Sequence, residues 1–110
     1  MLSPDAAYLS PETLAGIPPA GVRGLPHLCP DFVIELLPRS DSLRDTKEKM
    51  QDWIANGAAL GWLIDPYKQQ VLVYRPEADT EAVTGVAIQG SGPVEGFTLN
   101  VAQVWRFYET

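Results

Sequence analysis

The chain has 110 residues, a hydrophobic content of 45% and a formal net charge of −6, which indicate one globular domain with little stability to spare. No apolar run approaches the roughly 18 residues that span a bilayer, and no secretory leader precedes Ser3. The single cysteine, Cys29, excludes an internal disulfide framework. Together these features predict a cytoplasmic protein without a membrane partner.

The first predicted elements are short. Asp5 to Leu9 is typical of a strand, and Ser10 followed by Pro11 is typical of a helix start, with serine as N-cap and proline at the first helical position. Residues 16–30 hold four prolines and three glycines, which predicts an irregular loop.

The middle of the chain predicts a buried strand and then a helix. Phe32 to Leu37 is an apolar run interrupted by Glu35, and such a run suggests a strand covered on both faces. Ser42 to Asn56 is expected to be helical, with a capping-box spacing between Ser42 and Asp45. Gly57 is the expected C-terminal stop, and the apolar side chains expected to face inward are Leu43, Met50, Trp53 and Ile54.

The remaining elements complete a mixed α/β pattern. A hairpin is expected from two strands, Gly61 to Asp65 and Gln70 to Arg75, joined by a turn that begins at Pro66. A further strand is expected at Val83 to Ile88, and Phe97 to Leu99 leads into a last helix at Asn100 to Tyr108. This order predicts an α/β domain with a mixed central sheet.

The candidate catalytic residues lie in two predicted strands that each carry a carboxylate and in the predicted helix that follows them. Asp5 and Glu35 place one carboxylate on each of two strands, as a hard divalent cation requires. A buried Glu35 needs a partner or a metal, and a lysine of the next helix, Lys49 or Lys47, would supply an ammonium for a water or a phosphate oxygen. This is the outline of a metal-dependent phosphodiesterase.

Basic side chains gather only beside this site. The acidic net charge argues against independent nucleic-acid binding, because phosphate affinity is largely electrostatic. A nuclease can still be acidic overall if its cations cluster, and four basic residues lie within eleven positions: Arg39, Arg44, Lys47 and Lys49.

Other polar residues invite weaker interpretations. Asp31 shares the strand face of Glu35 and is either a further ligand or a strand-start residue. His27 and Cys29 lack a second pair of metal ligands, so a metal site there is not favoured. Asp65 before a proline is expected in a turn. The three tryptophans, which are expected in the core and not on a base-stacking surface, are Trp53, Trp62 and Trp105.

Several short motifs, in this order and spacing, resemble the Uma-two family. They are Pro4-Asp5, Glu35-Leu36-Leu37, Lys49 four residues before Trp53, Asn56-Gly57, Trp62-Leu63-Ile64-Asp65-Pro66, Val73-Tyr74-Arg75-Pro76 and Gly96-Phe97-Thr98-Leu99. That family is a large group of restriction-endonuclease-like proteins, abundant in cyanobacteria, within the PD-(D/E)XK nuclease superfamily. The resemblance implies a three-layer α/β/α core, Mg²⁺ and hydrolysis of phosphodiester bonds in DNA.

The resemblance also implies roles for individual residues. Asp5 and Glu35 match the two acidic metal ligands, and the carbonyl of Leu36 would be a third ligand. The superfamily's lysine would lie two residues after the second acid, where this chain has Leu37. The family pattern places a lysine on the following helix instead, and Lys49 matches it better than Lys47.

In members of this family, a helix with a glutamate and the opening strands of the sheet usually come before the position of Pro4, and this chain, with three residues before Pro4, is expected to lack them. Residues 1–110 are therefore expected to form one truncated domain with weak or no DNA cleavage. The alternative is a non-enzymatic remnant or a self-associating interaction domain. An exposed sheet edge favours a homodimer or a higher homo-oligomer.

Overall fold

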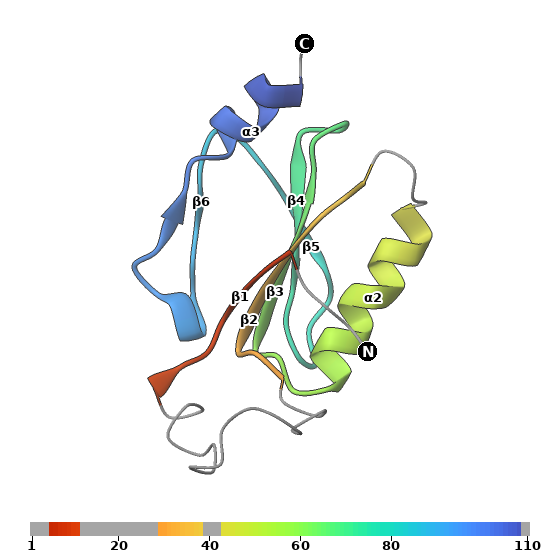
Figure 1. The fold of residues 1–110 in the computed structure, drawn as a ribbon, viewed down its shortest axis with the longest axis vertical. Coiled ribbons are helices and arrows are strands. Elements are labelled where there is room, and N and C mark those ends of the chain that lie inside the picture. The colour runs from red at the N-terminus through yellow and green to blue at the C-terminus, as the bar shows by residue number, and fades with distance from the viewer. Residues whose placement is uncertain (1–4, 12–28, 39–42, 109–110) are drawn as a thin grey trace.

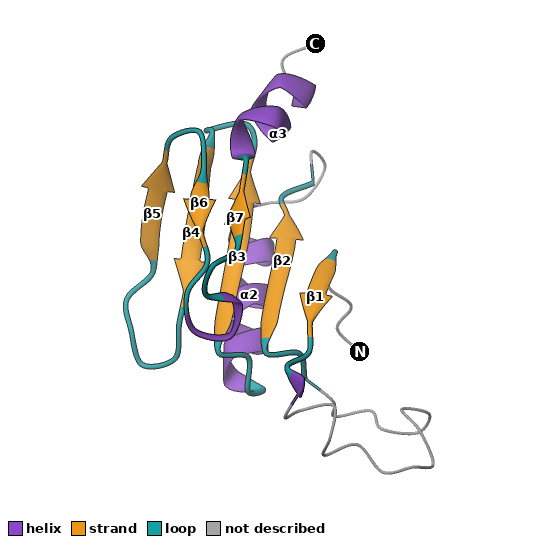
Figure 2. Ribbon diagram, turned by 90° about the vertical axis from the view of Figure 1, so that its left-hand side faces the viewer, coloured by secondary structure: helices purple, strands orange, loops and turns teal. Residues whose placement is uncertain are grey.

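The computed structural model describes residues 5–11, 29–38 and 43–108. Figure 1 shows the fold within these ranges, where a five-stranded sheet has the spatial order β1-β2-β3-β4-β5 and a two-stranded sheet pairs β6 with β7, as Figure 2 shows. In chain order the elements are β1 (Ala6–Tyr8), β2 (Phe32–Leu36), α2 (Leu43–Ala55), β3 (Leu60–Asp65), β4 (Gln70–Tyr74), β5 (Glu81–Thr84), β6 (Ile88–Gln89), a 3-10 turn η1 (Gly92–Val94), β7 (Thr98–Leu99) and α3 (Val101–Tyr108).

The large sheet is mixed, as predicted. β2 and β3 are parallel, with Phe32 opposite Leu60, and α2 supplies the long crossover that a parallel pair requires. All other neighbours in this sheet are antiparallel. β1 is therefore an edge strand that pairs with β2 alone among the described strands. The short helix expected at Ser10 and Pro11 lies mostly outside the described residues.

Helix α2 covers one face of the sheet (Figure 2). Its buried residues Thr46, Met50 and Trp53 recur at helical spacing and form the inward stripe. The helix ends before Gly57, whose φ of 118° suits the left-handed turn that closes many helices. The predicted helix is thereby confirmed, although its expected N-cap, Ser42, lies outside the described residues.

Alternating side chains of the strands build a separate apolar layer on each face. On the α2 face, strand residues pack with Met50 and Trp53; these strand residues are Val33, Leu63, Leu72 and Tyr74. On the other face, strand residues pack with β6 and α3; the buried members of this cluster are Phe32, Leu60, Trp62, Ile64, Val71, Val73, Ile88, Val101 and Trp105. The central strands are thus covered on both sides, as the apolar runs predicted.

The prediction of a single strand from Val83 to Ile88 is wrong. Val83 pairs with Val71 in the large sheet, whereas Ile88 pairs with Leu99 in the small one. Gly85 lies between them with φ 128°, a conformation that is accessible to glycine and strained for other residues. The chain therefore leaves one sheet at this glycine and enters another, which the local apolar pattern does not reveal.

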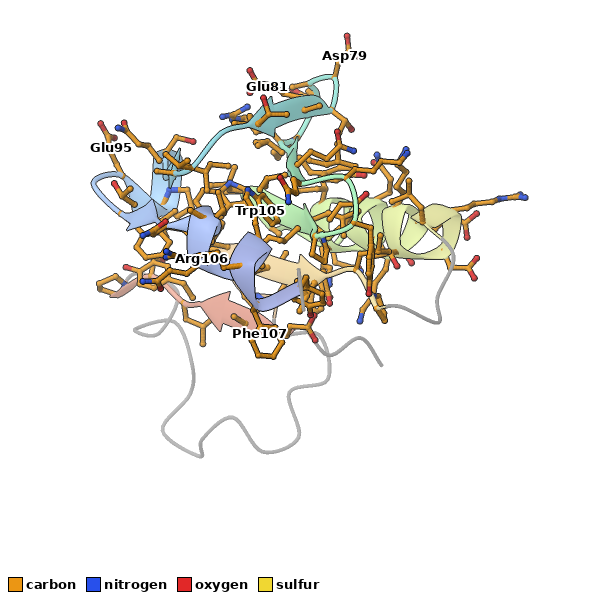
Figure 3. All side chains as sticks on the ribbon, turned by 90° about the horizontal axis from the view of Figure 1, so that it is seen from above. Asp79, Glu81, Glu95, Trp105, Arg106 and Phe107 are labelled. Atoms are coloured by element: carbon orange, nitrogen blue, oxygen red, sulfur yellow. The ribbon has the colours of Figure 1, made fainter. Side chains whose placement is uncertain are left out.

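Helix α3 completes the layer that faces away from α2. Asn100 Oδ1 accepts the backbone N–H of Ala102 at 3.2 Å and caps the helix start. Trp105 is buried and donates its indole N–H to the carbonyl of Gly85 at 3.1 Å. Figure 3 shows Phe107 on the β1 side of α3, where 76% of this residue is exposed.

Candidate active site

Glu35 is a buried carboxylate on the face of β2 that α2 covers. Only 3% of its surface is exposed, and its strand neighbours on the same face, Val33 and Leu37, belong to the apolar cluster beneath the helix. The period of two along a strand explains this placement. A carboxylate in such surroundings requires charged or hydrogen-bonding partners.

Two side chains of α2 provide those partners. Lys49 Nζ lies 3.2 Å from Glu35 Oε2 and 3.3 Å from Oε1. Trp53 donates its indole N–H to Oε2 at 2.9 Å. Because residues four apart share a helix face, both donors approach the carboxylate from the same side of α2.

Asp5 reaches this region from the neighbouring strand. The β1–β2 register ends at the pair of Ala6 and Ile34, and Asp5 directly precedes it, so a register continued by one residue would bring Asp5 opposite Glu35. Opposite residues of an antiparallel pair share a sheet face, with Cβ atoms about 4.5–5.5 Å apart. Asp5 Oδ2 also accepts the backbone N–H of Leu36 at 2.7 Å, so its carboxylate is attached to the strand that carries Glu35.

The structure gives two contacts among the four residues expected at the site, Asp5, Glu35, Leu36 and Lys49. Asp5 contacts Leu36, Glu35 contacts Lys49, and Glu35 and Leu36 are adjacent in β2. Lys47 is exposed and lines a hollow along α2 together with Leu43, Arg44, Glu48 and Gln51. Of these two lysines, Lys49 is therefore the one that contacts Glu35.

The donor set is compatible with Mg²⁺. It consists of two carboxylates and, in addition, the Leu36 carbonyl, and Mg²⁺ is commonly held by one or two carboxylates while it keeps several waters. The described part of the chain has no group of three or more histidine, cysteine, aspartate or glutamate residues that could hold a metal. A site of this composition suits a hard cation that remains largely hydrated and does not suit a fully protein-ligated zinc.

The other candidates have structural partners. Asp31 Oδ2 accepts the backbone N–H of Ser10 at 2.7 Å, which ties the chain after β1 to the start of β2. Asp65 Oδ1 accepts the N–H groups of Tyr67 and Lys68, at 3.0 and 3.1 Å, in the predicted turn. Cys29 Sγ donates to backbone carbonyls, including that of Trp53 at 3.7 Å. His27 lies outside the described residues.

Trp53 has a second role that the sequence interpretation missed. It was expected in the core, and it is 5% exposed there, but its indole N–H also contacts the site carboxylate. The available signal was its spacing of four residues from Lys49, which places both on one helix face. Trp62 and Trp105 are buried, as expected.

Comparison with known proteins identifies a matching family and a similar solved structure. A family model, Uma2, described as "Putative restriction endonuclease", matches residues 1–102. A solved structure described as "a putative nuclease belonging to DUF820 from Anabaena variabilis ATCC 29413" is similar, with a TM-score of 0.62 and 28% sequence identity. The match covers 72% of this chain and 45% of that chain, so the matched part spans less than half of that nuclease. Comparison with curated proteins gives no match.

These comparisons agree with the mixed sheet and its helices, and the restriction-endonuclease-like fold predicted from the sequence is confirmed. Within the described ranges, no helix is long and apolar enough to cross a membrane. The family suggested by the Asp5, Glu35 and Lys49 motifs is also confirmed: the chain belongs to the Uma2 family of restriction-endonuclease-like proteins.

Proposed function

We propose that this protein is a Mg²⁺-dependent endonuclease that hydrolyses phosphodiester bonds in DNA. The observation that carries the proposal is the contact of buried Glu35 with the partly exposed Lys49, at 3.2 Å, beside the end of β1 that Asp5 precedes. Two carboxylates and one ammonium on rigid elements are the groups that metal-assisted phosphodiester hydrolysis uses. Family membership supports the same reaction class.

Asp5, Glu35 and the Leu36 carbonyl would hold the cation. When bound there, Mg²⁺ supplies acidification of a water and offsets negative charge on the phosphate. Asp5 is exposed whereas Glu35 is buried, so the two carboxylates would hold the cation between the protein interior and solvent. DNA would then approach from the exposed side, where Asp5 lies.

Lys49 would supply the positive charge of the site. Its side chain is 34% exposed, whereas that of Glu35 is 3% exposed. The ammonium therefore lies at the boundary between the buried carboxylate and solvent, where it can orient an attacking water or neutralise a phosphate oxygen as a point charge. Lys47, on the same helix and exposed, offers a matched comparison.

The test is nicking of a supercoiled plasmid at low ionic strength, with and without Mg²⁺. Low salt is needed because the net charge of −6 opposes the approach of DNA. We expect weak nicking that requires Mg²⁺, is abolished in Glu35→Gln and Lys49→Met, and persists in Lys47→Met. Nicking that is equal in the wild type and Glu35→Gln, or no nicking at any Mg²⁺ concentration, would contradict the proposal.

A second candidate function, self-association, rests on the surface beside β1. All three residues of this edge strand are exposed. Two apolar grooves lie along the β2 face that turns away from α2. One is lined by Tyr8, Ile34, Val94 and Phe97 among others, and the other by Leu36, Leu99, Val104 and Phe107 among others. An open edge beside apolar surface favours pairing with another copy, which supports a homodimer.

Light scattering coupled to size exclusion at micromolar concentration tests this candidate. We expect the mass of a dimer for the wild type and of a monomer for Ala6→Lys, because a lysine on an edge strand opposes strand addition. Gln51→Lys makes the same charge change at an exposed position of α2 and should remain dimeric. A monomeric wild type that unfolds cooperatively would exclude self-association.

A further inference from the structure

The two donors to Glu35 differ in how firmly they are held. The Trp53 indole N–H lies 2.9 Å from Oε2, whereas Lys49 Nζ is farther away and bridges both oxygens, at 3.2 and 3.3 Å. We propose that Trp53 is the fixed anchor of the Glu35 carboxylate and that Lys49 is its exchangeable partner, displaced when a divalent cation binds. The inference rests on the proposed function, since it concerns the same site.

Trp53 is immobilised by its surroundings. The side chain is 5% exposed and belongs to the cluster that contains Met50 and Leu63. Its backbone carbonyl accepts the N–H of Ala58 at 3.1 Å, which ties the end of α2 to the chain before β3. An indole N–H only donates and does not titrate. Its hydrogen bond to Glu35 is therefore available at any pH at which the fold persists.

Lys49 can leave at lower cost. Its side chain is 34% exposed, and its ammonium ends a flexible four-carbon stem with three equivalent donors. A divalent cation beside Glu35 repels this ammonium, because two like charges cannot share one carboxylate at short range without a large Coulomb cost. The displaced ammonium is then free to interact with the phosphate group or the attacking water.

When Lys49 leaves, the Trp53 indole still donates a hydrogen bond to the buried Glu35 carboxylate. Removing the only partner of a buried charge is strongly destabilising, but the indole keeps Oε2 hydrogen-bonded while Lys49 moves. Oε1, which lies 3.3 Å from the Lys49 ammonium, then becomes the oxygen that faces the cation. Trp53 is thus a positioning residue that selects one oxygen of Glu35 for the cation.

The first test is titration calorimetry with Mn²⁺ alone. Trp53→Phe keeps an aromatic ring but removes the N–H, and we expect about tenfold weaker binding, as for one hydrogen bond to a charged group. Trp105→Phe is the matched control: it removes a buried indole donor whose partner is the Gly85 carbonyl, in the cluster on the opposite face. Its affinity should stay within about twofold of wild type. Equal Mn²⁺ affinity in Trp53→Phe and wild type would overturn the proposal.

The second test uses the unmodified chain. It has three tryptophans, so a ¹⁵N spectrum contains three indole N–H signals, which single substitutions assign. We expect the Trp53 signal to remain protected from solvent exchange when Mg²⁺ saturates the site. Rapid exchange of this signal in the Mg²⁺ form would overturn the anchor even if Trp53→Phe failed to fold.

Mn²⁺ binding by Lys49→Met distinguishes the role of Lys49 from that of Trp53. Comparing Mn²⁺ binding with DNA nicking in the wild type distinguishes the roles inferred for these two residues from the proposed function. Lys49→Met removes the competing ammonium, so Mn²⁺ binding should become tighter, whereas weaker binding would overturn the exchangeable role. If the wild type binds Mn²⁺ with these responses but does not nick DNA, the anchor stands and the proposed function fails. If the wild type binds neither Mn²⁺ nor Mg²⁺, the exchange assigned to Lys49 is wrong.

Discussion

Asp5 Oδ2 accepts the backbone N–H of Leu36 at 2.7 Å, so the residue just before β1 binds the last residue of β2 through its side chain. This contact attaches the edge strand to β2 and orients the Asp5 carboxylate beside the residue that follows Glu35. One carboxylate oxygen is engaged in this bond, and we expect the other to face the cation of the proposed site.

Asp5→Asn and Asp5→Ala should separate these two roles. Asparagine retains an oxygen that accepts from Leu36, so the stability to urea should be nearly unchanged, whereas Mn²⁺ binding should be lost with the charge. Alanine loses both, and the free energy of unfolding should fall by about 0.5–1.5 kcal/mol. Urea unfolding and calorimetry measure the two effects; Mn²⁺ affinity retained in Asp5→Asn would show that Asp5 serves the strand alone.

A double-mutant cycle on Glu35 and Lys49 should reveal a stabilising pair. Glu35→Gln leaves the ammonium without its carboxylate, and Lys49→Met leaves the buried carboxylate with the Trp53 donor. Each should cost about 2 kcal/mol, below the range for fully buried pairs because the Lys49 side chain is 34% exposed.

The double variant should recover part of this loss, with a coupling of about 1 kcal/mol measured by urea unfolding. Lys47→Met is the control on the same helix and should stay within about 0.5 kcal/mol of wild type, as expected for an exposed side chain. Strictly additive single effects would mean that the observed contact contributes no net stability.

Gly61 permits the close approach of α2 to β3. A Cβ at this position would lie 2.7 Å from Met50 Cε and 3.4 Å from Val33 Cγ2. Because the end of a methionine side chain can move, Gly61→Ala should cost only about 1–2 kcal/mol. Thermal unfolding measures this loss. In the double variant Gly61→Ala/Met50→Val, the shorter side chain at position 50 relieves the close contact, so the double variant should lose less stability than the two single variants together. A Gly61→Ala variant as stable as wild type would show that the helix adjusts without cost.

Cys29 should be a slow nucleophile at neutral pH. Burial, and to a lesser extent the charge of Asp31, raises the pKa of its thiol above the ordinary value of 9.0. Since the thiolate is the reactive form, alkylation by iodoacetamide should be slower in the folded chain than in urea-unfolded chain at the same pH. Mass spectrometry follows this reaction, and equal rates in both states would contradict the raised pKa.

The same shift predicts a loss of stability at alkaline pH. A thiol pKa that is raised by folding contributes stability that is present below the pKa of the unfolded thiol and is lost as pH rises through the folded pKa. Burial also raises the pKa of Tyr74, so Cys29→Ala should weaken the alkaline loss without abolishing it. Urea midpoints measured from pH 7 to above 9 in both proteins check the difference.

Much of the fold was predictable because its signals are local. The apolar run around Val33, the helical stripe of Met50 and Trp53, and the stop at Gly57 each depend on neighbours within a few residues. The strand expected at Val83 to Ile88 was wrong because strand pairing is non-local. The residue pattern of a strand segment does not specify which neighbouring strand each half of the segment pairs with. Here Gly85 redirects the chain from one sheet to the other.

The sequence by itself determined the residue types at the candidate site: carboxylates at Asp5 and Glu35 and two lysines on the helix that follows. Only the tertiary structure decided between Lys49 and Lys47 as the partner of Glu35, because the rotation of α2 over the sheet is set by core packing and not by the lysines themselves. The same packing directs the Trp53 indole N–H onto a buried carboxylate. A helical pattern predicts which residues face inward, but their hydrogen-bond partners depend on the strand that lies beneath them.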